Sequence, residues 1–179
     1  MLLAIRRAIT ATAAILGAFG ATGAEAQERT PEQEVLAFMI ARYGRDAVVS
    51  DSTWAEPCER FWDTCRPALG VPVDAWAAYL LVSREPALMA DLLPPDVNVT
   101  FTSEHVDDPR TPCSERKHVL TLSRPGVSRD GKTAVVWWAH LVRMDHLGTC
   151  GASRGGTLLL RKNAQGAWEV DRPLTMFIS

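Results

Sequence analysis

Apolar residues recur every three or four positions between Thr30 and Gly44, which predicts an amphipathic helix. Thr30 can cap the first turn, Pro31 suits the first helical position, and Gly44 is a typical helix stop. The apolar face of this helix would be formed by Val35, Leu36, Met39, Ile40 and Tyr43.

Two further helices are expected after an irregular stretch over residues 45–72. One covers residues 74–82, where apolar side chains again fall on one face. That face contains Trp76, Tyr79 and Leu80. A shorter helix is expected over residues 85–93, because Pro94 and Pro95 follow it and would stop it.

Beyond residue 96 the apolar period changes to two, which predicts half-buried strands. Val97, Val99 and Phe101 alternate with polar residues, and Asp130-Gly131 is a tight-turn signal. The expected strands cover residues 97–102, 118–124, 133–144, 157–161 and 167–170, and residues 174–178 could extend the last one. The sequence therefore predicts an α+β fold, in which N-terminal helices pack on one face of an antiparallel β-meander of four to five strands.

Residues 1–26 have the layout of a cleavable secretory signal peptide. Arg6 and Arg7 precede an uncharged apolar run, and Ala24 and Ala26 supply the small residues that signal peptidase accepts. The run is shorter and less apolar than a membrane anchor. We expect a periplasmic or secreted protein with one domain over residues 27–179 and no membrane span after cleavage. Mass spectrometry should find Gln27 at the mature N-terminus, and an intact Met1 would contradict cleavage.

The four cysteines predict disulfides, because an even count behind a signal peptide is typical of exported domains. They are Cys58, Cys65, Cys113 and Cys150, and three connectivities are possible. We favour Cys58–Cys65 and Cys113–Cys150. A straight helix would hold the first pair about 10 Å apart, beyond disulfide reach, so this pair requires a turn or a broken helix. No C-x-x-C pair is present and no histidine stands at ligand spacing, so no metal site is expected.

The charge balance argues against a nucleic-acid partner. The formal net charge is −2, whereas nucleic-acid binding needs a basic face. Arginine is preferred over lysine, and we interpret this as a compositional habit because the arginines are scattered along the sequence. No cofactor is expected either, since the glycines between 148 and 156 precede no helix that could cradle a phosphate.

The C-terminal half carries short motifs in a recognisable order. They are Leu122-Ser-Arg-Pro-Gly-Val-Ser128, Asp130-Gly-Lys-Thr-Ala-Val-Val136, Cys150-Gly151, Leu158-Leu-Leu-Arg-Lys162, Gly166-Ala-Trp-Glu-Val170 and Ile178-Ser179. This order resembles an uncharacterised family of bacterial exported proteins with an S-R-x-G…C-G…L-L-x-K…G-x-W-x-V pattern. Only Cys150 matches a family cysteine, which leaves it free to join Cys113. The resemblance implies an exported α+β domain and no specific activity.

Candidate site residues lie on the strand expected over residues 133–144. Counting along it places His140 and Trp138 on one face and Trp137 on the other. His140 is then either a histidine of the core or one that lines a cavity. An exposed Trp137 would mark a binding surface. No G-x-S-x-G elbow occurs, so no catalytic residue is predicted and we lean away from an enzyme.

Two hypotheses about function follow from these residues. In the first, the protein is a non-enzymatic exported domain that binds an envelope or secreted protein partner through the sheet face near Trp137. In the second, it is a cone-shaped domain of the nuclear-transport-factor-like kind, with a small-molecule or catalytic pocket around His140 and Trp138. A pocket that reaches His140 and holds a second polar partner would favour the second hypothesis, and a filled core would exclude it.

Overall fold

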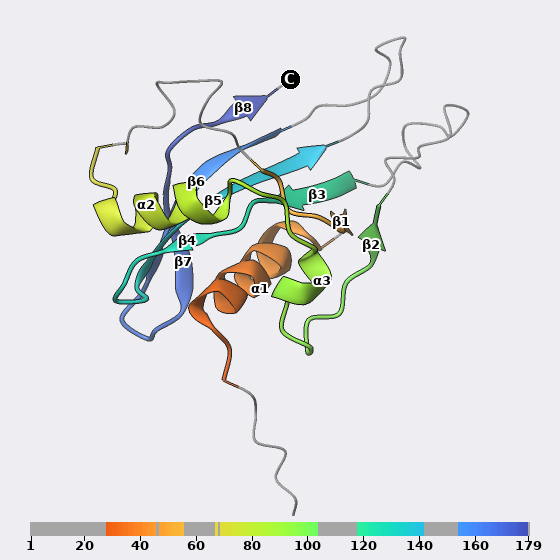
Figure 1. Ribbon diagram of the computed structural model, residues 1–179, viewed down its shortest axis with the longest axis horizontal. Helices are drawn as coiled ribbons and strands as arrows, with labels where there is room; N and C mark the ends of the chain where they lie inside the picture. Colours follow the sequence, from red (N-terminus) through yellow and green to blue (C-terminus); the bar gives the residue numbers. More distant parts are fainter. Residues whose placement is uncertain are drawn as a thin grey trace, which may run out of the picture.

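The computed structural model describes residues 28–45, 47–55, 67, 69–103, 118–141 and 154–178. Within these ranges the chain forms three helices and eight strands (Figure 1). The helices are α1 (Pro31–Tyr43), α2 (Val73–Val82) and α3 (Met89–Leu92). The strands are β1 (Ala47–Ser50), β2 (Phe101–Thr102), β3 (His118–Leu122), β4 (Gly126–Val127), β5 (Thr133–Leu141), β6 (Arg154–Lys162), β7 (Trp168–Pro173) and β8 (Phe177–Ile178).

Helix α1 begins and ends where the sequence predicts. The Thr30 hydroxyl accepts a hydrogen bond from the backbone N–H of Gln33 at 3.2 Å, and the Gln33 side chain accepts one from the Thr30 N–H at 3.0 Å. This reciprocal pair is a capping box. At the other end, the Gly44 N–H donates to the Ile40 carbonyl at 2.7 Å. The apolar face between these ends is buried, so the predicted amphipathic helix is confirmed.

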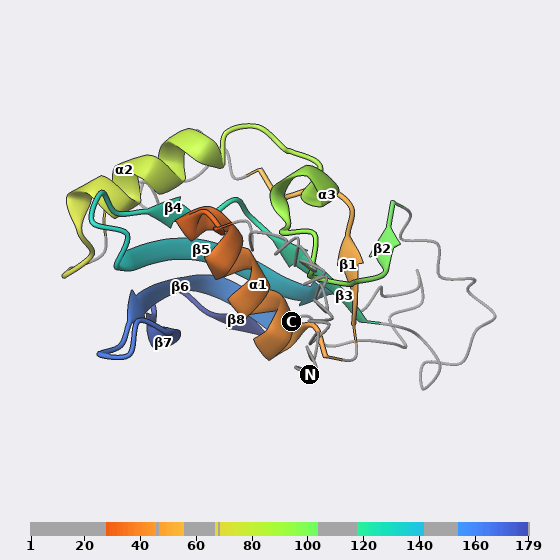
Figure 2. The ribbon, with the colours of Figure 1, turned by 90° about the horizontal axis from the view of Figure 1, so that it is seen from below.

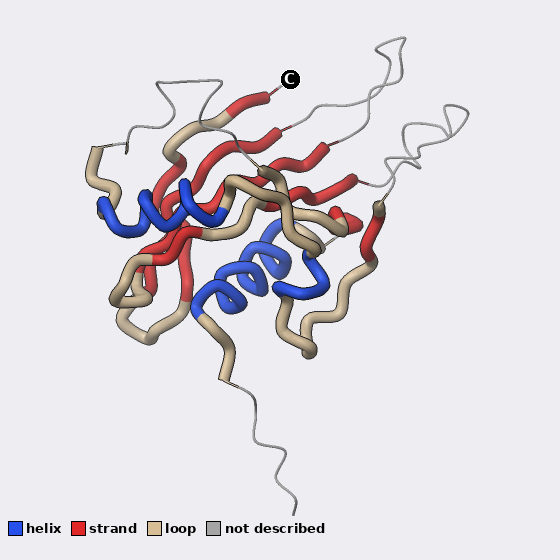
Figure 3. The backbone as a smooth tube through the Cα atoms, in the orientation of Figure 1, coloured by secondary structure: helices blue, strands red, loops and turns tan. Residues whose placement is uncertain are grey.

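The strands form one mixed sheet in the order β2-β1-β3-β5-β6-β7 (Figure 3). β4 also pairs with β5, and β8 also pairs with β6. The strands from β3 to β7 pair antiparallel, and the longest of them lie close to the ranges that the sequence predicts. β1 differs, because it runs parallel to both of its neighbours, β2 and β3.

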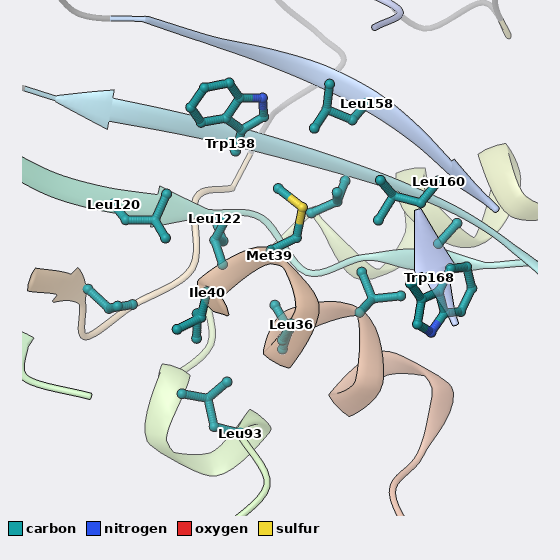
Figure 4. Packing of buried hydrophobic residues seen from close by; sticks show 14 of the residues in the cluster. Leu36, Met39, Ile40, Leu93, Leu120, Leu122, Trp138, Leu158, Leu160 and Trp168 are labelled. Atoms are coloured by element: carbon teal, nitrogen blue, oxygen red, sulfur yellow. The ribbon is translucent and has the colours of Figure 1, made fainter. Parts of the chain in front are cut away.

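The two longer helices cover opposite faces of this sheet. Neighbouring residues of a strand point to opposite sides, and those of β5 pack against different helices. On β5, Val136 and Trp138 pack with the apolar face of α1 (Figure 4). Val135, which directly precedes Val136, belongs to a second core with α2, and Trp137 packs against that core. Helix α2 lies along β4 and β5 (Figure 2). Gly126 permits this approach, since a Cβ atom there would lie 2.0 Å from the backbone nitrogen of Tyr79.

The expected fold class, N-terminal helices on one face of an antiparallel meander of four to five strands, is wrong. The structure is mostly a mixed sheet of eight strands, and its helices are few and cover both faces. Strand β1 lies inside the stretch predicted to be irregular. Its register partners include Phe101 and His118, far along the chain. Parallel pairing of this kind leaves no turn signal in the local sequence, unlike an antiparallel hairpin.

The third helix is shorter than the expected range because the chain before Met89 pairs with another segment. Leu88 is extended and forms a β-bridge with Ser52. The Thr53 N–H donates to the Ala87 carbonyl at 2.8 Å, and the Met89 N–H donates to the carbonyl of residue 51 at 2.7 Å. Tertiary pairing therefore overrides the local helical pattern.

The last strand does not extend β7, as the sequence had suggested it could. After Leu174 the chain turns, and β8 pairs with the far end of β6 through Gly155 and Phe177. The Leu174 N–H donates to the Thr157 carbonyl at 2.8 Å, which holds this turn against β6.

Several sequence predictions fall outside the described residues. These are the signal segment over residues 1–26 and the four cysteines at positions 58, 65, 113 and 150. Within the residues that the structure describes, no helix combines the length and the apolar character needed to cross a membrane.

Candidate functional site

A cleft of about 510 Å³ opens where α1 ends against the sheet. The helix and the turn after it supply one wall, formed by Arg42, Tyr43 and Arg45. A neighbouring hollow continues along the outer side of the helix over Phe38 and Ala41, and it shares the same three residues. The volume falls within the range of pockets that hold small organic molecules.

The opposite wall is a row of side chains from four neighbouring strands. β1 contributes Ala47, β3 His118, β5 His140 and β6 Arg154. The strand register explains why they meet: Ala47 pairs with His118, and His140 pairs with Arg154. His140 also pairs with Leu120, which lies two residues from His118 and so on the same face. The sheet therefore presents all four side chains toward the end of α1.

His140 is anchored to the end of α1. Its Nε2 atom donates a hydrogen bond to the Tyr43 carbonyl, one of the carbonyls that a helix C-terminus leaves without an intrahelical partner. A carbonyl can only accept, so Nε2 carries the proton and Nδ1 is left as the titrating nitrogen. Burial lowers the pKa of His140, and the nearby positive charges of Arg154 and His118 lower it further, while the bond to Tyr43 opposes this.

The second histidine of the cleft stands close to the first. The ring centroids of His118 and His140 are 6.3 Å apart. His118 is exposed at the rim, whereas His140 is half-buried. The cleft therefore brings a second polar group next to His140.

Trp138 forms a support behind the cleft and is not part of its lining. It is 4% exposed, and its ring stacks on the Tyr43 ring with centroids 4.4 Å apart. The edge of His140 meets the same indole at 5.4 Å and 87°. The stack fixes the Tyr43 ring. The Arg42 guanidinium lies over this ring, 5.6 Å from its centroid, in a cation–π contact.

Among the described residues, the cleft carries positive charge that no carboxylate compensates. Arg42, Arg45 and Arg154 are exposed at its rim, and none of them forms an ion pair with any residue that the structure describes. The described lining contains no carboxylate. Two arginines outside the cleft are paired: Arg124 meets Glu32 at 2.9 Å and Arg161 meets Asp171 at 3.4 Å.

The described lining contains no serine or cysteine that could act as a nucleophile. Across the described part of the chain, no three histidine, cysteine, aspartate or glutamate side chains gather where they could hold a metal ion. The side chains that the structure describes in the lining offer charge and hydrogen bonds for holding a ligand.

Trp137 lies on the other face of the sheet, as the alternation predicts. Its ring stacks on Trp54 at 5.2 Å and on Phe177 at 6.4 Å, and it is half-buried. The aromatic surface at this position is therefore supplied mainly by Trp54, which is 45% exposed, and by Phe177, which is 38% exposed. Trp137 and His140 do not share a site.

The sequence identified His140 but missed most of the residues around it. No sequence pattern marks Arg42 or Arg45 as a site residue, and Arg154 lies among the glycines between 148 and 156, where no strand is predicted. His118 begins a predicted strand, and no pattern in the sequence marks it as a site residue. The available signal was the placement of His118 and His140 on facing positions of two predicted strands, but their register could not be derived from the sequence.

Comparisons with protein-family models, with curated proteins and with solved structures gave no significant match for this chain.

Proposed function

We propose that this protein is an exported, non-enzymatic binding domain that holds a small molecule in the cleft at the end of α1. The observation that carries the proposal is the cleft itself, which reaches half-buried His140 and contains His118 as a second polar group. The export component rests on the signal-like segment of the sequence.

The cleft has the two kinds of surface that ligand sites combine. Tyr43 and Ala47 provide apolar contact, while His118, His140 and the arginines provide polar groups at fixed positions. The groups come from rigid elements, since His140 and Arg154 are strand residues and Tyr43 closes a helix. A site built on such elements needs little ordering when its ligand binds.

The proposed site is the pocket around His140 of the second hypothesis, and it does not require a cone-shaped fold. It also does not use Trp137, because that ring is stacked between two rings of the same chain on the opposite face. An enzymatic role has less support, since the described lining supplies histidines but no nucleophile and no carboxylate.

Blocking the cleft tests the proposal. Ala47→Phe would place a ring opposite His118, inside the cleft. Val48→Phe is the matched control, because Val48 is also half-buried on β1 but points to the other face. Small molecules of all charge types would be screened by thermal shift, and hits confirmed by calorimetry.

We expect ligands that stabilise the wild type and Val48→Phe but lose binding to Ala47→Phe. Ligands that bind Ala47→Phe as tightly as the wild type would place the binding site elsewhere and contradict the proposal. A change in far-ultraviolet circular dichroism would identify a variant that fails to fold. In that case Ala47→Leu, with a smaller side chain, replaces Ala47→Phe.

A further inference from the structure

We infer that the ligand of this cleft is a small organic oxyanion with two or more negative charges, such as a phosphate monoester or a dicarboxylate. This inference rests on the proposed function, since it names the chemical class that the same cleft would bind. Three arginines converge on this cleft, and the described wall around them contains no carboxylate.

Three arginines meet at one opening, two from the end of α1 and one from a strand far along the sequence. Arg42 comes from the last turn of α1, Arg45 from the turn that follows, and Arg154 from the start of β6. Guanidinium groups stay protonated at any physiological pH, so they bring three positive charges to the rim. The planar donors of arginine match the geometry of carboxylate and phosphate oxygens.

These charges have no internal partner among the described residues. Each of the four ion pairs in the described part of the chain lies elsewhere and uses other basic side chains: Arg29, Arg124, Arg161 and Lys162. Like charges held together repel one another, and a single carboxylate would neutralise only one of three. A ligand with at least two negative charges compensates the cluster best.

The end of α1 limits where the anion can lie. A helix C-terminus carries partial negative charge, which disfavours an anion directly on the helix axis. His140 donates to the Tyr43 carbonyl and Gly44 donates to the Ile40 carbonyl, so two of the terminal carbonyls are satisfied internally. We therefore place the anionic group toward Arg154 and Arg45, between the sheet wall and the turn.

The apolar part of the wall indicates that the ligand has an organic body. The Tyr43 ring and Ala47 line the cleft beside the charged groups, and Phe38 lies in the hollow that adjoins it. A bare inorganic ion would leave these surfaces in contact with water. A cleft of about 510 Å³ also exceeds what a single phosphate would fill.

A series of probes with one body and different charges tests the inference. The probes are 1-naphthyl phosphate, 1-naphthalenesulfonate and 1-naphthol, which carry up to two, one and no negative charges near neutral pH. Binding to the purified protein is measured by calorimetry at low and at moderate salt. The variants are Arg154→Gln and Arg45→Gln, with Arg161→Gln as control, because Arg161 is an exposed arginine of β6 outside the cleft.

We expect the phosphate to bind about tenfold or more tightly than the sulfonate, and naphthol to bind least. Arg154→Gln and Arg45→Gln should each weaken phosphate binding about tenfold, while Arg161→Gln leaves it unchanged. Added salt should weaken binding of the phosphate most.

Equal binding of all three probes, abolished by Ala47→Phe, would overturn the anion inference and leave the cleft as a binding site. Binding of the phosphate that Arg154→Gln and Arg45→Gln do not weaken would also overturn it. Failure of all three probes to bind would count against the anion inference and against the proposed function together.

Discussion

At its N-terminal end α1 is joined to the sheet by ion pairs, whereas the arginines around the cleft at its C-terminal end form no ion pair with the residues that the structure describes. In the first turn, Glu32 accepts hydrogen bonds from Arg124 at 2.9 and 3.2 Å. Glu34 meets Lys162 at 2.6 Å and accepts from the Trp168 indole at 3.0 Å. In the last turn, Arg42 has no carboxylate partner among the described residues.

The two ends of α1 contribute differently to the stability of the protein. The paired end satisfies its own charges and buries Trp168 beneath them, so it contributes to stability. At the cleft end, Arg45 and Arg154 line one opening without an ion-pair partner in the described part of the chain, and repulsion between them costs stability unless something else supplies negative charge. Functional sites commonly break local rules of this kind and are supported by the rest of the fold.

The largest effect on stability is expected at the paired end. Glu34→Ala should lower the free energy of unfolding by about 1–3 kcal/mol, because the buried Trp168 indole loses its acceptor. Glu34→Gln keeps a side-chain acceptor and should cost less than Glu34→Ala. Glu169→Ala is the control, since Glu169 is exposed beside Trp168 and forms no ion pair among the described residues. Urea unfolding measures all three.

The pH dependence of this end has a definite sign. Burial raises the pKa of Glu34, but hydrogen bonds from Lys162 and Trp168 and the charges of Lys162 and Arg29 together lower it below its ordinary 4.5. A lowered carboxyl pKa adds stability that is present above pH 4.5 and is lost as the pH falls through the folded-state pKa. If the free energies of unfolding of Glu34→Ala and the wild type differ by the same amount at about pH 7 and at about pH 3, the charge of Glu34 does not stabilise the paired end.

Much of the antiparallel sheet could be predicted from the sequence, because the signals for its strands and turns lie within short stretches of the chain. The alternation along β5 separated Trp137 from Trp138, and the structure places their side chains in different surroundings. The turn before β5 is present, with Gly131 at a φ of 68° that favours glycine. The capping residues of α1 gave its ends equally well, since a cap is defined within a few residues.

The site could not be predicted from the sequence, because its residues come from segments far apart in the chain. His140 was placed on the correct strand, but its partners depend on the register of β1, β3 and β6 against one another. Register is set by tertiary packing, and a shift by one residue would turn every side chain to the other face. The arginines looked scattered for the same reason: Arg45 and Arg154 lie far apart in the sequence and are brought together only by the order of the strands.

A smaller effect is expected from the pH dependence of His140. Burial and the charges of Arg154 and His118 lower its pKa below 6.5, against the bond to Tyr43. The unfolded chain then binds more protons between the two pKa values, so the folded state loses stability as the pH falls below 6.5. His140→Gln retains a donor toward the Tyr43 carbonyl but does not titrate.

Thermal unfolding between about pH 8 and about pH 5 should show the wild type losing more stability than His140→Gln as the pH falls. A bound dianion favours the charged histidine, so saturating 1-naphthyl phosphate should reduce this difference. The groups that surround His140 in the described structure are Tyr43 of α1, His118 of β3, Arg154 of β6 and Trp138 of its own strand. If the stabilities of the wild type and His140→Gln change with pH in parallel, the charges of the cleft do not shift the pKa of His140.

The smallest effect on stability is expected at Arg154, a residue that we infer to bind the ligand. Arg154→Gln removes an exposed charge that has no ion-pair partner among the described residues, and it relieves the repulsion with His140. Its unfolding free energy should stay within about 0.5 kcal/mol of the wild type or rise slightly. Arg124→Gln, which breaks the pair with Glu32 at the other end of α1, should instead lower stability. If Arg154→Gln proves the more destabilising of the two, Arg154 has a structural partner, and the contrast between the two ends of the helix does not hold.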